Sequence, residues 1–370
     1  MRLVYWAGGN PFHHHQDLNR LQQAWQRPDT IIMHDWCWNA SVKRADIVLP
    51  CTTMLERADI GMTPRDPYII AMAKAVEPIG EARDDYDILA GIARAMGCED
   101  KFCEGRTGEE WVRHLWDQSR RRAADRGVDL PDYDGLVAAE FCRIDTPSDE
   151  PVLFADFRAD PEANPLATPS GRIELFSETV AAFGYADCHG HATWNAPDEW
   201  LGSATAAHPL HLLGKQPRNK LHSQLDPGSH AARAKVRGHE AVEINPGDAA
   251  SRGISEGDIV RISNDRGACL GGAVITPDVM PGVVMMSTGA WFDPCPETGL
   301  CRHGNPNVLA PDLATSPLSQ GPGAHSCLVE VTRYDGDPPP VEAFQPPVFA
   351  ARDLSLIHIS EPTRQAEIAV

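Results

Sequence analysis

The chain has 370 residues, a length that suggests two or three domains of roughly 100–200 residues each. It contains 33 Lys and Arg residues and 52 Asp and Glu residues, which gives a formal net charge of -19. This negative charge disfavours the phosphate contacts that drive nucleic-acid binding. No apolar stretch reaches the roughly 18 uninterrupted residues that a membrane span needs. We therefore expect a loop-rich globular protein with no nucleic-acid partner and no membrane span.

Residues 1–146 predict the first domain. Short apolar runs at 2–7, 30–34 and 47–50 alternate with amphipathic patterns at 18–26, 87–96 and 109–124. That alternation is typical of βαβ units around a parallel sheet. Three strands are fewer than the usual five or six of a doubly wound sheet. We expect a partial α/β domain whose upstream part is missing.

The second half has a different pattern. A Pro- and Asp-rich connector is expected over 147–207, and short β-rich runs follow within 208–335, at 210–213, 241–244, 259–263, 268–274, 283–287 and 326–333. Evenly spaced short strands favour a small closed barrel. Residues 336–353 read as a Pro-rich tail, and 354–370 resemble a translated sequencing adapter, which we exclude as non-native; a short genuine tail strand is the alternative.

The cysteines do not suggest a metal site, and the sequence lacks the familiar motifs of hydrolases and nucleotide kinases. None of the ten cysteines forms a Cys-x-x-Cys pair, so no metal is assigned to them, and free, mostly buried thiols are expected. The sequence has no Ser nucleophile elbow, no His-Glu-x-x-His and no phosphate-binding Gly-x-x-x-x-Gly-Lys-Ser/Thr. Hydrolase and nucleotide-kinase functions therefore lack support.

A glycine turn follows the first expected strand. Gly8 and Gly9 let backbone N–H groups approach a pyrophosphate, and a helix expected to begin near Gln16 would direct its positive end at the same anion. The histidines at 13–15 diverge too much to share one ion and suit donation to phosphate or a heterocycle. An ordinary strand-to-helix turn remains the alternative.

Further polar residues are expected at the ends of the following strands. Asp35 ends the second strand, where an acid commonly accepts hydrogen bonds from ribose or a base. Ser41 and Arg57 follow at positions where a ligand crevice would open. A solvated surface is the alternative for the charged residues.

Three segments of the second half are rich in amide, imidazole and glycine groups: 214–226, 302–307 and 315–321. Amides offer the paired donors and acceptors that a pterin or guanine edge requires, and Arg suits phosphate. A polar loop is the alternative for the first segment taken alone. Trp6 and Trp291 could line the path by which substrate approaches; packing in the core or at an interface is the alternative.

Together, five ordered motifs resemble the molybdenum oxidoreductases of the dimethyl sulfoxide reductase family, and within it the biotin sulfoxide and trimethylamine N-oxide reductases. They are Tyr-Trp-Ala-Gly-Gly-Asn-Pro-Phe-His-His-His-Gln-Asp from Tyr5, Ala-Asp-Ile-Val-Leu-Pro from Ala45, Thr52-Thr53 with Glu56-Arg57, Leu-His-Ser-Gln-Leu-Asp from Leu221 and His-Gly-Asn-Pro-Asn from His303. The resemblance covers about residues 2–333.

This resemblance implies a bacterial enzyme that reduces S-oxides or N-oxides by oxygen-atom transfer at molybdenum bis(molybdopterin guanine dinucleotide). It implies a six-stranded double-psi β-barrel after the α/β part. It further implies that the chain is the C-terminal half, with the serine ligand of molybdenum in a missing N-terminal half, and that the isolated chain is inactive.

By the same resemblance, two sets of residues would bind the cofactor. The α/β set comprises Gly8, Gly9, Asn10, His14, Gln16, Asp35, Ser41, Arg57 and Asp87. The barrel set comprises Gly214, Gln216, Arg218, His222, Ser223, Gln224, Asn305, Asn307, Gln320 and Gly321. Where many relatives carry Thr-x-Thr-Ala, this chain has Asn-Ala-Ser-Val from Asn39, a departure from the family pattern.

Other functions remain open at this level. One alternative is a non-catalytic molybdopterin-binding or assembly module, and another is a fragment of a formate or nitrate enzyme. The expected partners are the missing half, a small oxide and an electron donor, either a protein or NAD(P)H. The residues leave the compartment open between bacterial cytoplasm and periplasm.

Overall fold

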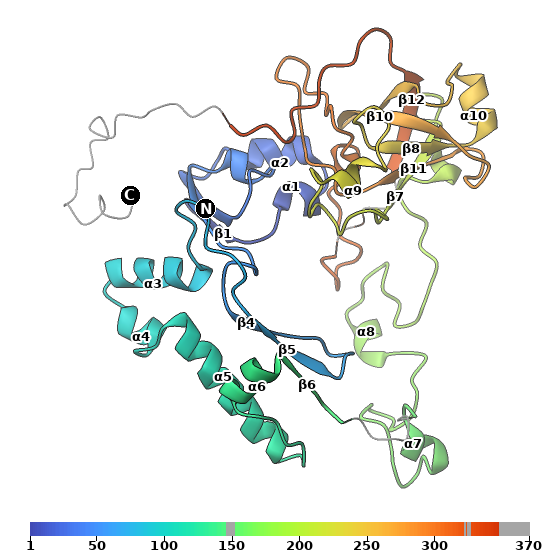
Figure 1. Cartoon of the computed structure of the whole chain (residues 1–370). Coiled ribbons are helices and arrows are strands. Elements are labelled where there is room, and N and C mark those ends of the chain that lie inside the picture. Colours follow the sequence, from blue (N-terminus) through green and yellow to red (C-terminus); the bar gives the residue numbers. More distant parts are fainter. Residues whose placement is uncertain (146–151, 322, 324–326, 348–370) are drawn as a thin grey trace.

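The computed structural model describes residues 1–145, 152–321, 323 and 327–347. The expected adapter-derived tail at 354–370 and the end of the Pro-rich tail lie outside these residues. Within the described ranges, no helix is long and apolar enough to cross a membrane. The described chain forms a small parallel sheet, a small antiparallel sheet and a closed barrel (Figure 1).

The parallel sheet has the order β1-β2-β3 and confirms the expected α/β pattern. Its strands pair parallel in register, with Leu3 opposite Thr30 and Ile32 opposite Ile47. Buried Ile31 and Met33 of the central strand pack with Val42. The elements are β1 (Leu3–Ala7), α1 (Pro11–His14), α2 (Leu18–Trp25), β2 (Thr30–Asp35), the 3-10 helix η1 (Val42–Arg44) and β3 (Ile47–Pro50).

An antiparallel sheet of order β4-β5-β6 follows and was not expected from the sequence. One face packs on α5 and α6, where Trp116 and Leu136 are buried against Ile69. Helix α5 starts at a capping box in which Thr107 and Glu110 exchange hydrogen bonds with each other's backbone. The elements are β4 (Asp59–Met62), β5 (Tyr68–Met72), α3 (Asp85–Ala95), α4 (Glu99–Cys103), α5 (Gly108–Ala124), α6 (Tyr133–Ala139) and β6 (Phe141–Arg143).

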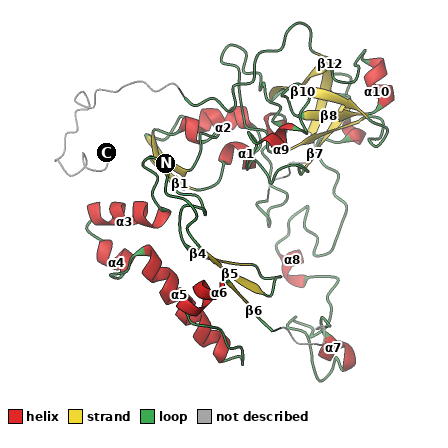
Figure 2. Ribbon diagram, in the orientation of Figure 1, coloured by secondary structure: helices red, strands yellow, loops and turns green. Residues whose placement is uncertain are grey.

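The segment between the sheets and the barrel is mostly loop, as Figure 2 shows. Its short helices are α7 (Ala155–Ala159), α8 (Glu178–Ala182) and the 3-10 helix η2 (Leu201–Ser203). It contacts the barrel through Glu199, whose carboxylate accepts two hydrogen bonds from Arg266 at 2.6 and 2.7 Å. The connector is therefore fixed to the barrel at its C-terminal end.

The barrel closes in the order β10-β8-β11-β7-β12-β9, which confirms the double-psi barrel and its six strands. Two strand pairs, β10 with β8 and β11 with β7, are parallel and the others antiparallel. The strands are β7 (Leu210–Lys215), β8 (Ala241–Ile244), β9 (Ile259–Asn264), β10 (Gly267–Ile275), β11 (Val283–Ser287) and β12 (Cys327–Arg333). Between them lie α9 (Ser229–Ala232), α10 (Pro246–Ser251) and the 3-10 helix η3 (Pro306–Val308).

The parallel sheet and the barrel share one hydrophobic core. Phe12 and Leu18 belong to the same buried cluster as the barrel residues Val242 and Ile262. The ring of Phe12 stacks on Phe292 with centroids 5.8 Å apart and an angle of 7° between the planes. The guanidinium of Arg44 lies 4.6 and 4.9 Å from these two ring centroids. Because aromatic and aliphatic side chains of both parts are buried together, the two parts form one packed unit.

All ten cysteines lie in the described ranges and are free, as expected, but only four are buried. The expectation of mostly buried thiols was wrong. Six sit at intermediate exposure because they lie on the small sheets, on helix starts and on loops such as the one that holds Cys295.

Candidate functional site

The glycine turn at the end of β1 needs its glycines. Gly8 and Gly9 have φ angles of 75° and 81°, a left-handed conformation that other residues rarely adopt. A Cβ on Gly8 would meet no atom within 4 Å, so open space lies beside it, whereas one on Gly9 would lie 3.4 Å from the indole nitrogen of Trp6 and 3.9 Å from the ring of His14. The backbone of the turn therefore borders open space at Gly8 and lies close to the His14 imidazole at Gly9.

The helix expected to begin near Gln16 is present. A short helix, α1, first starts at Pro11. Helix α2 then starts after Asp17, whose carboxylate accepts from the Arg20 amide at 3.2 Å. Its N-terminus is therefore capped by the chain's own acid. Gln16 is buried and donates to the His14 carbonyl at 3.3 Å.

A chain of hydrogen bonds leads from the tip of β2 to the barrel. Asn39 donates to Asp35 at 2.5 Å, and the Asn39 oxygen accepts from the Ser41 amide at 2.9 Å. The Ser41 hydroxyl donates to Asn10 at 2.5 Å, and Asn10 donates to the Ser223 hydroxyl at 3.3 Å. Burial raises the pKa of Asp35. These contacts bring four predicted site residues from both halves together.

Three imidazoles gather beside that chain. The ring of His13 lies 5.1 Å from that of His14 and 5.6 Å from that of His222, and the latter two are 6.3 Å apart, measured between centroids. Burial, together with the neighbouring His14, His222 and Lys220, lowers the pKa of His13 to about 4. Its Nδ1 atom is buried without a hydrogen-bond partner. A neutral imidazole nitrogen is therefore available at this point for a ligand.

The amides of Asn305 and Asn307 are engaged by backbone groups. Asn305 donates to the carbonyls of Phe12 at 3.3 Å and Ala290 at 2.8 Å, and Asn307 donates to the carbonyl of His13 at 2.7 Å. Both side chains are buried. Their placement therefore holds helix α1, with its histidines, against the barrel.

Arg57 and Asp87 lie in a second group near the end of β3. Arg57 donates to the Thr52 carbonyl at 3.3 Å and lies 3.5 Å from Asp59. The Thr52 hydroxyl donates to Asp84, which precedes the helix that holds Asp87. The Cys51 amide donates to the Asp35 carbonyl at 3.2 Å, which connects this group to the tip of β2.

The remaining predicted barrel residues are more dispersed. Gly214 lies in β7 opposite Met286, and Gln216, Arg218, Gln224 and Gln320 are exposed. Gly321 accepts from the Thr315 amide at 2.8 Å. Within the described part of the chain, no hydrogen bond joins Gln216, Arg218, Gln320 or Gly321 to Asn10 or to the three imidazoles.

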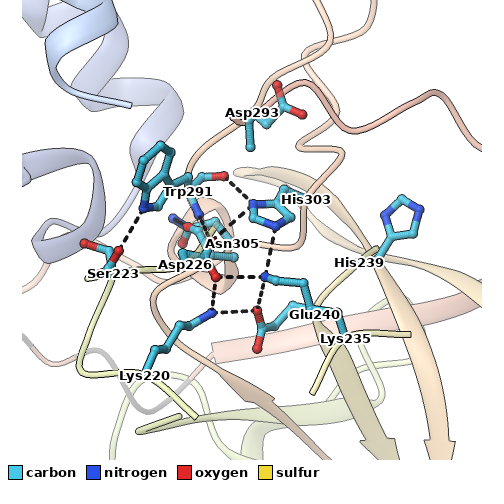
Figure 3. Close-up of polar contacts among 12 residues, drawn as sticks. Lys220, Ser223, Asp226, Lys235, His239, Glu240, Trp291, Asp293, His303 and Asn305 are labelled. Atoms are coloured by element: carbon cyan, nitrogen blue, oxygen red, sulfur yellow. Dashed lines mark hydrogen bonds and ion pairs between the residues drawn. The ribbon is translucent and has the colours of Figure 1, made fainter. Parts of the chain in front are cut away.

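Five buried ionisable residues behind Ser223 were missed by sequence reasoning and form what we call the ion cluster (Figure 3). They are Lys220, Asp226, Lys235, Glu240 and His303. Asp226 and His303 occur in quoted motifs, but the lysines look like residues of a polar loop. The sequence does not distinguish these lysines from Arg218, Arg233 and Arg237, which lie in the same segment between two apolar strands. Trp291, considered for the substrate approach, is buried and donates its indole N–H to the Ser223 carbonyl at 2.8 Å.

No metal centre emerges from the described residues, since no three or more of their His, Cys, Asp and Glu side chains are grouped to hold an ion. The candidate site is instead a set of amide, hydroxyl, imidazole and glycine groups where the carboxyl edge of the parallel sheet meets the barrel. Groups of this kind bind and orient a polar ligand and carry out little acid–base chemistry themselves.

Comparison with known proteins fits this arrangement. Residues 1–95 match the family model described as "Molybdopterin oxidoreductase", and residues 210–328 match that described as "Molydopterin dinucleotide binding domain". The chain is 46% identical to biotin sulfoxide reductase of Cereibacter sphaeroides, over 91% of this chain and 45% of that protein. It is 42% identical to dimethyl sulfoxide/trimethylamine N-oxide reductase of the same organism, over 94% and 43% of the two chains.

Among solved structures, acetylene hydratase from Pelobacter acetylenicus is similar in fold, with a TM-score of 0.68 at 20% identity over 90% of this chain and 44% of that chain. The chain thus spans less than half the length of the relatives that it matches.

Proposed function

Because the chain belongs to the molybdopterin oxidoreductases, we propose that it is the C-terminal, cofactor-binding part of an enzyme that reduces S-oxides or N-oxides. The observation that carries this proposal is the hydrogen-bond chain from Asp35 through Asn10 to Ser223. It joins the ligand-binding edge of a parallel sheet to a barrel loop, so one extended ligand can contact both.

The chemistry of the site residues fits a pterin dinucleotide. The glycine turn leaves open space beside the backbone, where N–H groups can approach a phosphate. The unpartnered Nδ1 of His13 and the nearby His222 ring offer hydrogen-bonding groups for a heterocycle. Asp35, an acid at the tip of the second strand, suits ribose or guanine.

We assign cofactor contacts to both sets of residues. Gly8, Gly9, Asn10, His14, Gln16, Asp35 and Ser41, with Arg57 and Asp87 further along the edge, serve one end of the ligand. His222, Ser223 and Gln224 serve the pterin, with Gly214, Gln216, Arg218, Gln320 and Gly321 at the rim. Asn305 and Asn307 act mainly by fixing α1.

The bound group is taken to be molybdenum bis(molybdopterin guanine dinucleotide), which supplies two-electron oxygen-atom transfer. The residues of this chain bind it, orient it and exclude water behind it. We propose that the protein ligand of molybdenum comes from the part of the full-length enzyme that this chain does not span. An electron donor, either a protein or NAD(P)H, completes the reaction.

Two measurements test the proposal. Reduction assays on the full-length enzyme with biotin sulfoxide, methionine sulfoxide and trimethylamine N-oxide should show turnover of at least one oxide. Absence of turnover with all three oxides would contradict the assigned reaction. Replacing His222 and Gln224 by Ala should lower molybdenum content and activity together. The exposed His230, which lies outside the site, provides the matched control as His230→Ala.

A further inference from the structure

The ion cluster lies directly behind the barrel loop, which we define as residues 216–226. Lys220 contacts Asp226 at 2.7 Å and Glu240 at 3.0 Å. Lys235 contacts the same two carboxylates at 2.9 and 3.1 Å. All four side chains are 5% exposed or less. Figure 3 shows the two lysines and two acids as a closed ring of contacts beside His303.

The charges of the ion cluster balance. His303 lies with Nδ1 3.1 Å from the Trp291 carbonyl, and Nε2 2.9 Å from the Lys235 ammonium. A carbonyl only accepts and an ammonium only donates, so Nδ1 carries the proton, Nε2 accepts, and His303 is neutral. Burial, aided by the charge of Lys235, lowers the pKa of His303 to about 3. Burial alone would lower the pKa of Lys220, but Glu240 and Asp226 outweigh it and raise that pKa.

The ion cluster fixes the barrel loop at both ends of the motif that starts at Leu221. Lys220 precedes that motif and Asp226 ends it. The other Asp226 oxygen accepts from the Trp291 amide at 3.2 Å, and the Trp291 indole donates to the Ser223 carbonyl. A buried carboxylate and a buried indole therefore hold the backbone that presents Ser223 toward Asn10.

The loop backbone is also unusual. His222 and Leu225 both have φ angles of 52°, a left-handed conformation that costs free energy in residues other than glycine. The His222 carbonyl lies so close to Gly289 that a Cβ there would approach it to 1.9 Å. Surrounding contacts must hold this conformation, and the ion cluster supplies ion pairs on both sides of these two residues, at Lys220 and Asp226.

Resting on the proposed function, we infer that Lys220, Asp226, Lys235, Glu240 and His303 are positioning residues that hold His222 and Ser223 in the geometry required by the pterin. Stability alone is a weak reason for such a cluster, because apolar residues often replace buried ion pairs without loss of stability. A balanced charge network instead fixes one arrangement of the loop among several of similar compactness.

The test uses Lys220→Met, which leaves the two carboxylates with one ammonium. The control is Arg252→Met, which removes a partly buried ion pair with Glu330 elsewhere in the same barrel. Hydrogen exchange in the full chain should rise roughly tenfold in Lys220→Met for the Gln224 amide, which donates to the Leu221 carbonyl at 2.9 Å, with strand amides such as that of Val284 unchanged. Arg252→Met should leave the loop protected.

Charge rebalancing provides the rescue. Lys220→Met/Glu240→Gln keeps one ammonium facing one carboxylate, so loop protection should return most of the way. If Lys220→Met does not fold, loop protection is compared between this double variant and the wild-type chain instead. In the full-length holoenzyme, the ratios of molybdenum and pterin to protein should fall in Lys220→Met and recover in the double variant.

The outcomes separate the two claims. If the loop stays protected in Lys220→Met, or if the double variant is as open as the single one, the positioning role is overturned. If the loop opens but molybdenum and pterin content remain unchanged, the loop does not contact the cofactor, and the proposed role of His222 and Ser223 is overturned instead.

Discussion

The barrel and the antiparallel sheet bury their apolar residues in opposite ways. Every barrel strand has two neighbours, so no edge is left open, and side chains such as Val242 and Ile262 are fully buried inside. The antiparallel sheet has two edges and one uncovered face. On that face Tyr68, Ile70 and Phe141 are 41%, 51% and 52% exposed.

Pairing across the antiparallel sheet explains this exposed face. Ile70 pairs with Phe141 and Ile69 with Cys142, so residues alternate between the helix-covered side and the open side. The rings of Tyr68 and Phe141 lie 5.8 Å apart on the open side. Closure lets the barrel bury its apolar residues without leaving a strand edge open, whereas an open sheet with two apolar faces depends on another surface to cover the second face.

The largest expected effect sharpens this contrast by truncating the same residue type in each region. Ile262→Ala should lower the free energy of unfolding of the barrel by about 3 kcal/mol, because it leaves a cavity in a closed core. Ile70→Ala should cost under about 1 kcal/mol, since its side chain is half exposed. Denaturant titration followed by hydrogen exchange of each region measures both, and equal losses would contradict the contrast.

Acid should weaken the barrel next most strongly. His303 and His13 are kept neutral when folded, with pKa values lowered to about 3 and about 4 by burial. The unfolded chain binds protons at these residues below about pH 6.5, so stability is full above that pH and falls as the pH drops toward the folded values. From pH 7 to pH 4.5, His303 alone should account for about 2–3 kcal/mol.

The matched pair for this pH effect is His303→Gln against His230→Gln, the latter at an exposed position. The slope of unfolding free energy against pH, measured by denaturant titration, should flatten only in the former. A slope unchanged in His303→Gln would show that this imidazole is not neutral in the folded barrel.

Gly289→Ala should have a smaller effect that is local to the barrel loop. The new methyl group would collide with the His222 carbonyl, and Gly289 has a φ of 96°. We therefore expect the free energy of unfolding to fall by about 2 kcal/mol. Gly253→Ala shares a positive φ of 62° but has no atom within 4 Å of the added Cβ, so it should cost only about 1 kcal/mol. Thermal unfolding of the two variants compares them, and equal shifts would rule out the steric contact.

The smallest change in stability is expected on the open face of the antiparallel sheet. Ile70→Thr with Phe141→Ser should alter the free energy of unfolding by about 0.5 kcal/mol or less. The same pair should reduce self-association and binding of an apolar dye, because it removes half-exposed side chains. Light scattering at increasing concentration checks this, and unchanged association would mean that the face is covered within the chain.

Sequence patterns predicted the barrel far better than the antiparallel sheet. The barrel strands are apolar runs bounded by Gly and Pro, and observed strands such as Ala241–Ile244 and Val283–Ser287 match the expected ranges. The antiparallel sheet escaped prediction because β6 has three residues and pairs with a strand about seventy residues earlier in the chain. Such a pairing leaves no periodic signal.

The candidate site was predicted in part. Asn10, Ser41 and Ser223 meet because motifs place them at strand ends and on a loop that the fold brings to one edge. The helix expected near Gln16 is present and begins at Leu18, whereas the short helix that starts at Pro11 was not expected. The ion cluster was invisible because composition assigns charged residues to solvent, and only tertiary packing shows that these five are buried and paired.

The stacked pair Phe12 and Phe292, with Arg44 across both rings, has a consequence for motion. Burial lowers the pKa of Arg44 to about 10, and hinge opening between sheet and barrel would have to unstack two rings and rehydrate a guanidinium at once. This contact between the parallel sheet and the barrel therefore resists gradual separation of the two parts. The two walls of the site should therefore move as a single rigid body.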